Sequence, residues 1–298
     1  MTRTGRILRG VGGQYLIADD AGPVGMASAR GIFRKEGLVP TIGDLVECEP
    51  SGDPDTPWRM CKILPRRNYL VRPPIANLDG MVITLSAAEP PPDSYLADKL
   101  LTICLLNQIE PLICLTKTDL PQAIPDVTAG YRAAGCRTIE TEPDDQASLN
   151  QLREWMRGRV ITFAGQSGVG KSTLLNRLAG AEIALIGSLS GRVGRGKQTT
   201  RHVELYPLAG GYLADTPGFS SLELEDLGVS GEQLAAGYPE ILAAAGQCRF
   251  TGCRHLGELG CAVPGCGMDP DRLQRYRYFR TRLDSLNPYS GSRPHTRS

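Results

Sequence analysis

Eight residues near the middle of the chain have the composition and spacing of a phosphate-binding loop. They read GQSGVGKS at 165–172 and match the pattern G-x-x-x-x-G-K-[ST], between an apolar strand-like segment and an amphipathic helix-like one. Glycines let backbone N–H groups face a phosphate, Lys171 can neutralise its charge, and the Ser172 hydroxyl can ligate Mg²⁺. A glycine-rich turn without a ligand is the alternative. The predicted nucleotide contacts here are Gly165, Gln166, Ser167, Gly168, Val169, Gly170, Lys171, Ser172 and Thr173.

The segment GYLADTPGF, further along the chain, suits the metal and the terminal phosphate of the same ligand. Its strand-like part ends in Asp215, whose carboxylate can hold the water shell of Mg²⁺. The backbone N–H of Gly218 can reach the terminal phosphate, so Gly218 joins Lys171 as a catalytic candidate. An ordinary turn at a strand end is an equal alternative, because Asp, Pro and Gly are the usual turn residues.

The stretch between these two segments, GRVGRGKQTTRH, is rich in glycine and arginine and lies where a GTPase places its first switch. The threonine of such a switch closes over magnesium when the terminal phosphate is present. Thr200 is therefore the candidate for a magnesium ligand with a catalytic role, and Thr199 stands beside it. A solvated basic loop is the alternative.

The tetrapeptide TKTD at 116–119 carries side chains that could read a guanine base. Asp119 can accept hydrogen bonds from the ring N–H and the exocyclic amine of guanine, a pattern that adenine lacks. The stem of Lys117 can pack along the plane of the base. A buried strand that merely ends in turn residues is the alternative. The predicted base contacts are Thr116, Lys117, Thr118 and Asp119.

The base-reading tetrapeptide precedes the phosphate loop, which reverses the usual order in GTPases. In a doubly wound sheet, ligands bind outside the carboxyl ends of the strands, so the site depends on which strand ends lie together in space. If the usual termini were joined and the chain opened elsewhere, the order would change and the site would stay intact. Circular permutation therefore accommodates both motifs.

Four of the nine cysteines cluster near the C-terminus with a histidine, and three of them form with it the pattern C-x4-C-x-H-x5-C. Three thiolates and one imidazole suffice for a closed tetrahedral zinc site, which is structural because no position stays open for catalysis. Cys266 is a possible competitor for Cys261, although Cys261 gives the shorter loop from the histidine. Scattered buried thiols are the alternative. The predicted zinc ligands are Cys248, Cys253, His255 and Cys261.

The segment RLQRYRYFRTR that follows interleaves arginines with aromatic residues. Arginine can pair with phosphates and aromatic rings can stack on bases, a combination that suits RNA. A helix whose aromatic residues pack against the zinc module is an equal alternative. The arginines concerned are Arg272, Arg275, Arg277, Arg280 and Arg282.

The elements that must position these motifs divide the chain into three regions. Residues 1–72 give short strand-like runs between Gly, Pro and Asp, typical of a small closed barrel, and NYLVRPPIANLD reads as a linker. In residues 73–222 strands alternate with helices, which predicts an α/β domain with a parallel sheet covered on both faces. Residues 223–298 are helical and Cys-rich, and they end in a tail whose composition indicates disorder.

Length and composition are those of a multi-domain globular protein. A chain of 298 residues suffices for two or three domains, and a formal net charge of +1 excludes any argument for a nucleic-acid partner from overall charge. The N-terminus lacks the apolar core of a signal peptide, and no run approaches the ~18 apolar residues of a membrane span. We expect a cytoplasmic protein with no membrane partner.

In this order, the barrel, TKTD, GQSGVGKS, GRGKQTT, DTPGF and the cysteine pattern resemble the bacterial circularly permuted GTPases called ribosome small-subunit-dependent GTPase A. The resemblance covers nearly the whole chain and implies an N-terminal OB-fold, a permuted P-loop GTPase domain and a C-terminal helical zinc-binding domain. It implies late maturation of the 30S subunit, binding to its 16S rRNA, and GTP hydrolysis that the subunit stimulates. The expected cofactors are GTP or GDP, Mg²⁺ and one structural Zn²⁺, in a monomer.

Three positions depart from the pattern of that family. Thr116 stands where the base motif usually begins with Asn, the segment TIETEPD lacks a Ser-Ala signature, and Gln198 replaces a common His. Phe219 follows the DTPG turn, and an apolar ring cannot orient water by hydrogen bonding. We expect slow intrinsic turnover, with Gln198 the catalytic candidate for positioning water and His202 a weaker one.

Two other functions fit parts of the sequence. One is an ATP-dependent P-loop enzyme in which TKTD is fortuitous. The other is an RNA-binding assembly module whose bound nucleotide is only structural. Competition between nucleotides distinguishes the first, and full activity in cells after Lys171→Ala would favour the second. The sequence shows no second-substrate carboxylate motif that would argue for a kinase.

Overall fold

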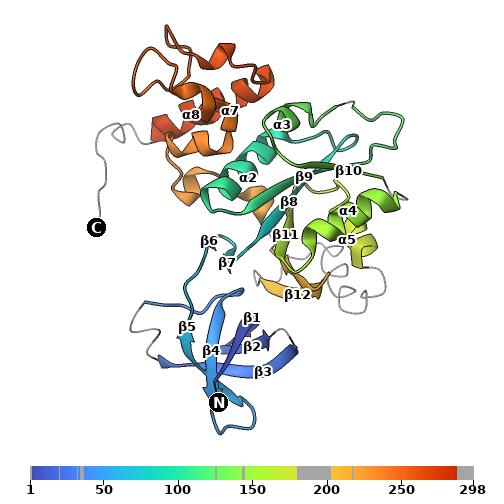
Figure 1. The fold of residues 1–298 in the computed structure, drawn as a ribbon, viewed down its shortest axis with the longest axis vertical. Helices are drawn as coiled ribbons and strands as arrows, with labels where there is room; N and C mark the ends of the chain where they lie inside the picture. The colour runs from blue at the N-terminus through green and yellow to red at the C-terminus, as the bar shows by residue number, and fades with distance from the viewer. Residues whose placement is uncertain are drawn as a thin grey trace.

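Three bodies follow one another along the chain: an N-terminal barrel, a central sheet flanked by helices, and a C-terminal helical body (Figure 1). The computed structural model describes residues 2–19, 21–31, 33, 37–124, 126–142, 145–179, 203–216 and 218–286. The sheet lies between the other two bodies, which both pack against it. No helix in these ranges combines the length and apolar character needed to cross a membrane.

The N-terminal barrel closes from five strands in the order β1-β2-β3-β5-β4. Alternate residues such as Ile7, Ile17 and Val46 point inward and form its core. This confirms the predicted OB-like barrel. Among these strands β3 has a weak signal in the sequence, because its glycines and small residues have low strand propensity. The strands are β1 (Arg3–Val11), β2 (Gln14–Asp19), β3 (Gly22–Ala29), β4 (Leu45–Pro50) and β5 (Trp58–Ile63).

The central sheet has the strand order β10-β9-β8-β11-β13-β12, and only β12 runs antiparallel to its neighbour. Met81 and Ile83 of β8 face a core shared with α2, whereas Val82 faces a core shared with α4 and α5. Both faces are covered, as predicted. The strands are β8 (Gly80–Ser86), β9 (Glu110–Thr116), β10 (Thr138–Thr141), β11 (Val160–Ala164), β12 (Glu204–Leu208) and β13 (Gly211–Asp215). The helices are α2 (Ser94–Leu106), α3 (Ala129–Ala133), α4 (Gln146–Met156) and α5 (Lys171–Ala179).

The parallel register brings the carboxyl ends of these strands to one edge of the sheet. Ser86 at the end of β8 pairs with Thr116 at the end of β9, which pairs in turn with Thr141 of β10. On the other side of β8, Ile83 pairs with Ala164 at the end of β11. The phosphate loop after β11 and the tetrapeptide after β9 are therefore separated only by the end of β8. This arrangement fits the predicted circular permutation.

The segment NYLVRPPIANLD, which the sequence indicates as a linker, contains a small hairpin. Strands β6 (Tyr69–Val71) and β7 (Pro74–Ala76) pair antiparallel. Leu70 and Ile75 are buried in the central core together with Leu8 of the barrel. The sequence did not predict this hairpin, because it contains two prolines and proline is rare within sheets. The hairpin thus attaches the barrel to the sheet, and the predicted domain boundary at residue 72 falls within it.

The C-terminal body packs closely on α2. Gly237 lies so near α2 that a Cβ atom there would come within 2.0 Å of the Thr102 hydroxyl oxygen. Tyr238, Ile241 and Tyr276 share the apolar core of α2 and β8. The elements are the 3-10 helices η2 (Phe219–Ser221), η3 (Glu225–Leu227), η4 (Gln233–Gly237) and η5 (Val263–Gly265), and the helices α7 (Pro239–Ala245) and α8 (Pro270–Leu286).

A buried cluster of ion pairs joins α2 to α8. The Asp98 side chain is fully buried; Arg272 Nη1 donates to its Oδ1 at 2.6 Å and Arg275 Nε donates to its Oδ2 at 2.5 Å. Arg272 also donates to Glu240 at 2.9 Å and lies 4.9 Å from the ring centroid of Tyr238. Burial raises the pKa of the Asp98 carboxyl, and the two guanidinium groups oppose that shift. Each oxygen of the buried carboxylate therefore has a cationic partner.

The arginine-rich segment of α8 faces the protein. Arg272, Arg275 and Arg280 are buried, Arg277 donates to a backbone carbonyl, and Arg282 pairs with glutamates. Of its aromatic residues, Tyr276 and Phe279 are buried and Tyr278 is exposed. The structure thus favours the packing alternative over the interpretation of this segment as an RNA-binding stripe.

Removal of the Asp98 carboxylate would leave two buried guanidinium groups without their shared partner. We predict that Asp98→Ala lowers the free energy of unfolding by about 3–5 kcal/mol, the usual cost of an uncompensated buried charge. Urea denaturation of the full chain, followed by circular dichroism, measures the change. Glu225→Ala, which removes a partly exposed partner of Arg282, is the control and should cost at most about 1 kcal/mol. Equal losses in the two variants would contradict this role for Asp98.

Candidate nucleotide site and metal centre

The phosphate loop connects the buried strand β11 to the N-terminus of α5. Its first residue, Gly165, has φ of +147°, and a Cβ atom there would lie 2.3 Å from the Thr84 carbonyl oxygen. Only glycine fits this turn. Val169 is fully buried and anchors the loop, while Ser167 and Gly168 are exposed. Ser172 and Thr173 lie in the first turn of α5, where a helix N-terminus favours anions.

Lys171 folds back over its own loop. Its Nζ donates to the carbonyl oxygens of Gly165 at 2.8 Å and Gln166 at 2.6 Å. Burial lowers the pKa of the Lys171 ammonium group, and among the described residues no carboxylate pairs with it. A partly desolvated cation without a counter-ion suits a phosphate ligand.

The Gln166 side chain supplies a second sign of an incomplete site. Its Oε1 is buried and has no hydrogen-bond partner within the described chain. Buried polar atoms are almost always satisfied, so this acceptor is expected to be completed by a ligand or water. The orphaned acceptor, the lysine without a counter-ion and the helix N-terminus together fit the phosphates of a nucleotide.

Thr116 ties the base-reading tetrapeptide to the phosphate loop. Its buried hydroxyl oxygen lies 2.5 Å from the carbonyl oxygen of Val169 and 3.1 Å from that of Leu85. A hydroxyl has a single proton, and the shorter contact is the one to the phosphate loop. Threonine at this position therefore makes a direct tie between the two motifs.

Lys117 makes a second tie across the site. Its Nζ donates to the carbonyl oxygen of Gly168 at 2.9 Å and also to that of Glu89. Pro90 flanks the same loop, since its Cδ lies 3.5 Å from the Cβ position of Gly168. The motifs in the sequence did not indicate Glu89 or Pro90 as part of the site. Only the strand order indicates Glu89 and Pro90. Because β8 lies between β9 and β11, the chain that leaves β8 must pass the edge of the sheet where the nucleotide site lies.

The remaining base-side residues lie at the adjoining strand end. Asp119 is exposed, so a base can reach its carboxylate. Thr118 donates weakly to Glu142, with 3.5 Å between its hydroxyl oxygen and the carboxylate oxygen. Glu142 follows β10 in the segment TIETEPD, where the Ser-Ala signature is absent. The end of β10 thus borders the base side of the site.

The metal-side residues follow β13. Asp215 ends that strand and is half-buried, and Thr216 is buried next to it. Gly218 has φ of +104°, which favours glycine, and no side chain crowds its Cβ position closely. The ring of Phe219 is buried in the central core, away from any water.

The switch candidates are not among the described residues. Thr199, Thr200, Gln198 and His202 all lie outside the ranges that the structure describes. The next described residue, Val203, packs into the central core directly before β12. The magnesium-ligand role of Thr200 and the water-positioning role of Gln198 therefore stay predictions.

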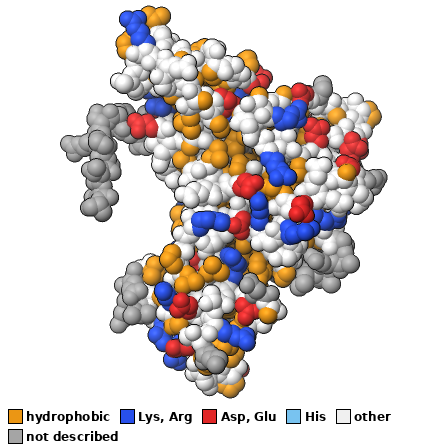
Figure 2. Space-filling model, viewed as in Figure 1, with side chains coloured by type: hydrophobic (Ala, Val, Ile, Leu, Met, Phe, Trp, Pro, Cys, Tyr) orange, Lys and Arg blue, Asp and Glu red, His pale blue; other side chains and the backbone are white. Residues whose placement is uncertain are grey.

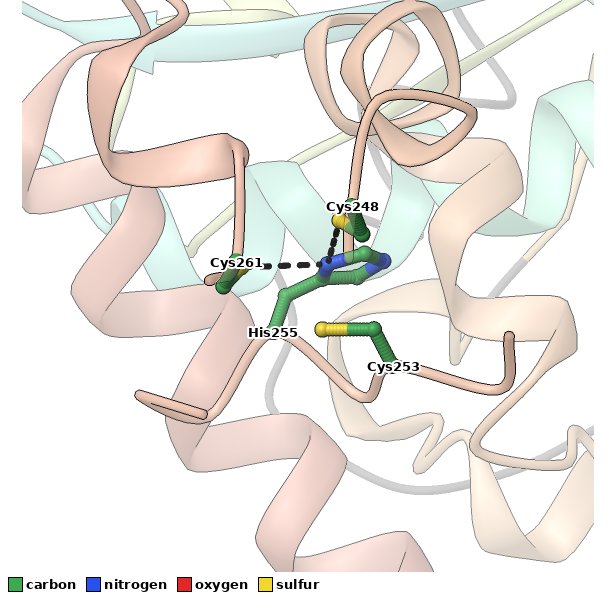
Figure 3. A group of neighbouring side chains, drawn as sticks. All are labelled: Cys248, Cys253, His255 and Cys261. Carbon is green, nitrogen blue, oxygen red and sulfur yellow. Dashed lines mark hydrogen bonds between the residues drawn. The ribbon is translucent and has the colours of Figure 1, made fainter. Parts of the chain in front are cut away.

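Three thiols and one imidazole converge in the C-terminal body (Figure 3). The ligand atoms of Cys248, Cys253, His255 and Cys261 all lie within 4.8 Å of one another. His255 Nδ1 is 3.7 Å from Cys248 Sγ and 3.5 Å from Cys261 Sγ. Ligands around tetrahedral zinc are separated by about 3.5–3.8 Å, given bonds of about 2.0–2.3 Å. The donor set fits a structural zinc ion.

The fifth candidate, Cys266, is exposed and does not belong to this group. Burial raises the pKa of the Cys253 thiol to about 12, and its neighbouring thiols add to the shift. Burial lowers the pKa of His255, which keeps the imidazole neutral. A cation among these groups would favour the thiolates that zinc requires.

Protein-family models of one family match both the N-terminal barrel and the central sheet with its helices. A model described as RsgA GTPase matches residues 63–225, and a model described as RsgA N-terminal domain matches residues 4–55. Proteins named small ribosomal subunit biogenesis GTPase RsgA from Bacillus pumilus (strain SAFR-032) and Bacillus subtilis (strain 168) are 40% and 39% identical to this chain. Each alignment covers 95% of this chain and 98% of the relative.

Two solved structures have a similar fold. The crystal structure of YloQ, described as a circularly permuted GTPase, superposes with a TM-score of 0.79 at 32% identity and covers 97% of both chains. YjeQ from Thermotoga maritima superposes with a TM-score of 0.78 at 26% identity, over 95% of this chain and 99% of that one. The description of YloQ as circularly permuted agrees with the order of the motifs in this chain.

The tie made by Thr116 predicts a measurable effect on nucleotide binding. Thr116→Val keeps the shape but leaves the Val169 carbonyl without its donor, at a cost of about 0.5–1.5 kcal/mol. We expect GDP affinity to fall about 2- to 12-fold, as measured by titration with a fluorescent GDP analogue. Thr116→Asn restores a donor and is expected to bind at least as tightly as the unchanged chain. Unaltered affinity in Thr116→Val would show that the tie does not support the site.

The cysteine group predicts one zinc ion per chain. Cys253→Ser should lower the zinc content well below one ion per chain, because serine is a poor zinc ligand. Mass spectrometry of the purified protein's metals measures this stoichiometry. Cys266→Ser is the matched control and should keep the full zinc content, since Cys266 is exposed and outside the group. Zinc loss in Cys266→Ser would overturn the ligand assignment.

Proposed function

Because the chain belongs to the RsgA GTPase family, we propose that it is a GTPase of small-subunit maturation, which hydrolyses GTP to GDP and phosphate. The observation that carries this proposal is the 2.5 Å contact between Thr116 and Val169. It joins a guanine-reading segment to a phosphate loop across strands that are far apart in the chain. The relatives named small ribosomal subunit biogenesis GTPase supply the process.

Each part of the site has a role in phosphoryl transfer to water. The loop N–H groups and Lys171 stabilise charge on the phosphate that is transferred. The Gly218 N–H donates a hydrogen bond to an oxygen of the terminal phosphate. Ser172, Thr200 and Asp215 would hold Mg²⁺, which neutralises charge on the phosphates when bound. On the base side, Asp119 selects guanine, and Thr116, Lys117 and Thr118 position the segment that carries it.

The residue after the DTPG turn cannot orient the attacking water. Phe219, which follows the DTPG turn, is buried in the core and cannot contact water. We propose that Gln198, which has the required donor and acceptor, positions the attacking water, and that turnover is slow until the subunit stimulates it. The subunit's own contribution can be large, because groups supplied by a partner raise GTPase rates by about 10³- to 10⁵-fold.

The other two bodies would serve binding to the subunit. The OB-like barrel suits single-stranded or irregular RNA, so we assign it to 16S rRNA. One Zn²⁺ held by Cys248, Cys253, His255 and Cys261 would stabilise the C-terminal body, with no position open for catalysis. The protein is proposed to act as a monomer in the cytoplasm, where the small subunit is assembled.

Phosphate release from GTP and from ATP, each with and without purified 30S subunits, tests this function. We expect release from GTP alone, with strong stimulation by the subunit. Lys171→Ala should lose at least 100-fold of the stimulated rate, because the cation on the phosphates is removed. In the same assay, Gln198→Ala should lose the stimulation and keep GTP affinity.

The rival functions give different results in that assay. Equal release from ATP would support an ATP-dependent P-loop enzyme. An intrinsic rate as fast as the stimulated one would rule out the proposed dependence on the subunit. Full function of Lys171→Ala in cells would point to a nucleotide with only a structural role.

A further inference from the structure

The outer end of the metal-binding loop exposes apolar side chains. We define the loop tip as residues 249–252 and 257–260. Phe250 is 55% exposed and Leu259 is 83% exposed, the largest fraction among the exposed large apolar side chains of the described residues. Exposed apolar groups gathered on one feature mark interaction sites more often than scattered ones do.

The two halves of the loop tip are braced against each other. The backbone N–H of Arg249 donates to the Gly260 carbonyl oxygen at 2.9 Å. A Cβ atom on Gly260 would lie 2.8 Å from the Arg249 Cβ, so the two segments are in close contact. The Glu258 carboxylate accepts hydrogen bonds from the backbone N–H groups of Arg254 and Leu256. Phe250 and Leu259, one on each half, are therefore presented by an ordered loop.

The loop tip carries one cation, Arg249, and one carboxylate, Glu258, which faces Arg254. The guanidinium group of Arg249 lies 5.3 Å from the centroid of the Phe250 ring. Arg254 has carboxylate partners in Glu258 and Asp284, whereas in the described part of the chain no ion pair includes Arg249. Figure 2 shows basic and apolar side chains next to each other at the far end of the C-terminal body, away from the sheet. The loop tip thus offers a cation and an aromatic ring side by side.

We propose that this loop tip binds unpaired nucleotides of the small-subunit rRNA, with Phe250 stacked on a base and Arg249 paired with a phosphate. The inference deepens the proposed function and rests on it. Aromatic rings and guanidinium planes are the groups that stack on unpaired RNA bases. Leu259 adds apolar contact beside the stacked base. An apolar protein groove fits less well, because it would desolvate the Arg249 cation without a counter-charge.

The contribution of the stack can be measured with single substitutions in the full chain. Binding to purified 30S subunits is measured with a non-hydrolysable GTP analogue bound. Phe250→Ala should weaken binding about 5- to 150-fold, the usual range for loss of one base stack. Arg249→Ala should also weaken binding. It should reduce the slope of log affinity against log salt concentration by about one, because one phosphate contact is lost. Leu242→Ala, exposed on α7 outside the loop tip, is the control and should bind like the unchanged chain.

Two controls establish whether weaker binding comes from the loss of the stack itself. Zinc content and intrinsic GTP hydrolysis should be unchanged in Phe250→Ala, since Phe250 is exposed and remote from the core. A photocrosslinking amino acid placed at position 250 should link to rRNA within the complex. Crosslinks to ribosomal protein alone would overturn the choice of partner.

The outcomes also distinguish this inference from the proposed function. If the unchanged chain binds the subunit and is stimulated by it, but Phe250→Ala binds equally tightly, the loop-tip assignment is wrong and the proposed function stands. If the unchanged chain neither binds the subunit nor is stimulated by it, the proposed function fails and the loop-tip assignment fails with it.

Discussion

The nucleotide site depends on one constraint, which is that β8, β9 and β11 run parallel and end at the same edge of the sheet. Ser86 at the end of β8 pairs with Thr116 at the end of β9, and Ala164 at the end of β11 pairs with Ile83, three residues before the end of β8. Strand order in space, rather than order along the chain, decides what meets there. A permuted chain can therefore place its base-reading segment before its phosphate loop. The same order puts the segment after β8 in the centre, where Glu89 contacts Lys117.

Sequence patterns predicted the features that are local in the chain. The strand, glycine loop and helix at 160–179 could be predicted because their signals lie within twenty neighbouring positions. The Cys and His pattern is local for the same reason. Contacts between distant residues could not be predicted in this way. Thr116 meets Val169 across 53 positions, and no local pattern in the sequence indicates that contact.

The arginines of α8 show most clearly what the sequence alone cannot predict. An Arg-rich helix with interleaved aromatics has one composition whether it faces RNA or a protein core. Asp98 determines that this helix faces the protein core. It lies 174 positions before Arg272 and contacts it only when α2 and the C-terminal body are packed together. Once buried, that carboxylate needs cationic partners, because an isolated buried charge costs several kcal/mol. Phe250 and Arg249, by contrast, stay outside because the loop that holds them is short and braced by Gly260.

Helix α2 connects the nucleotide site to the C-terminal body through two sets of contacts. Its N-terminus follows the segment whose Glu89 carbonyl binds Lys117 and whose Pro90 flanks the phosphate loop. Its middle carries Asp98, bound to two arginines of α8, and Thr102, packed against Gly237. Shifting α2 relative to α8 would separate buried charges, so the helix and the C-terminal body must move as one unit. A rearrangement beside Gly168 that displaced α2 would therefore carry the metal centre and its loop tip along with it.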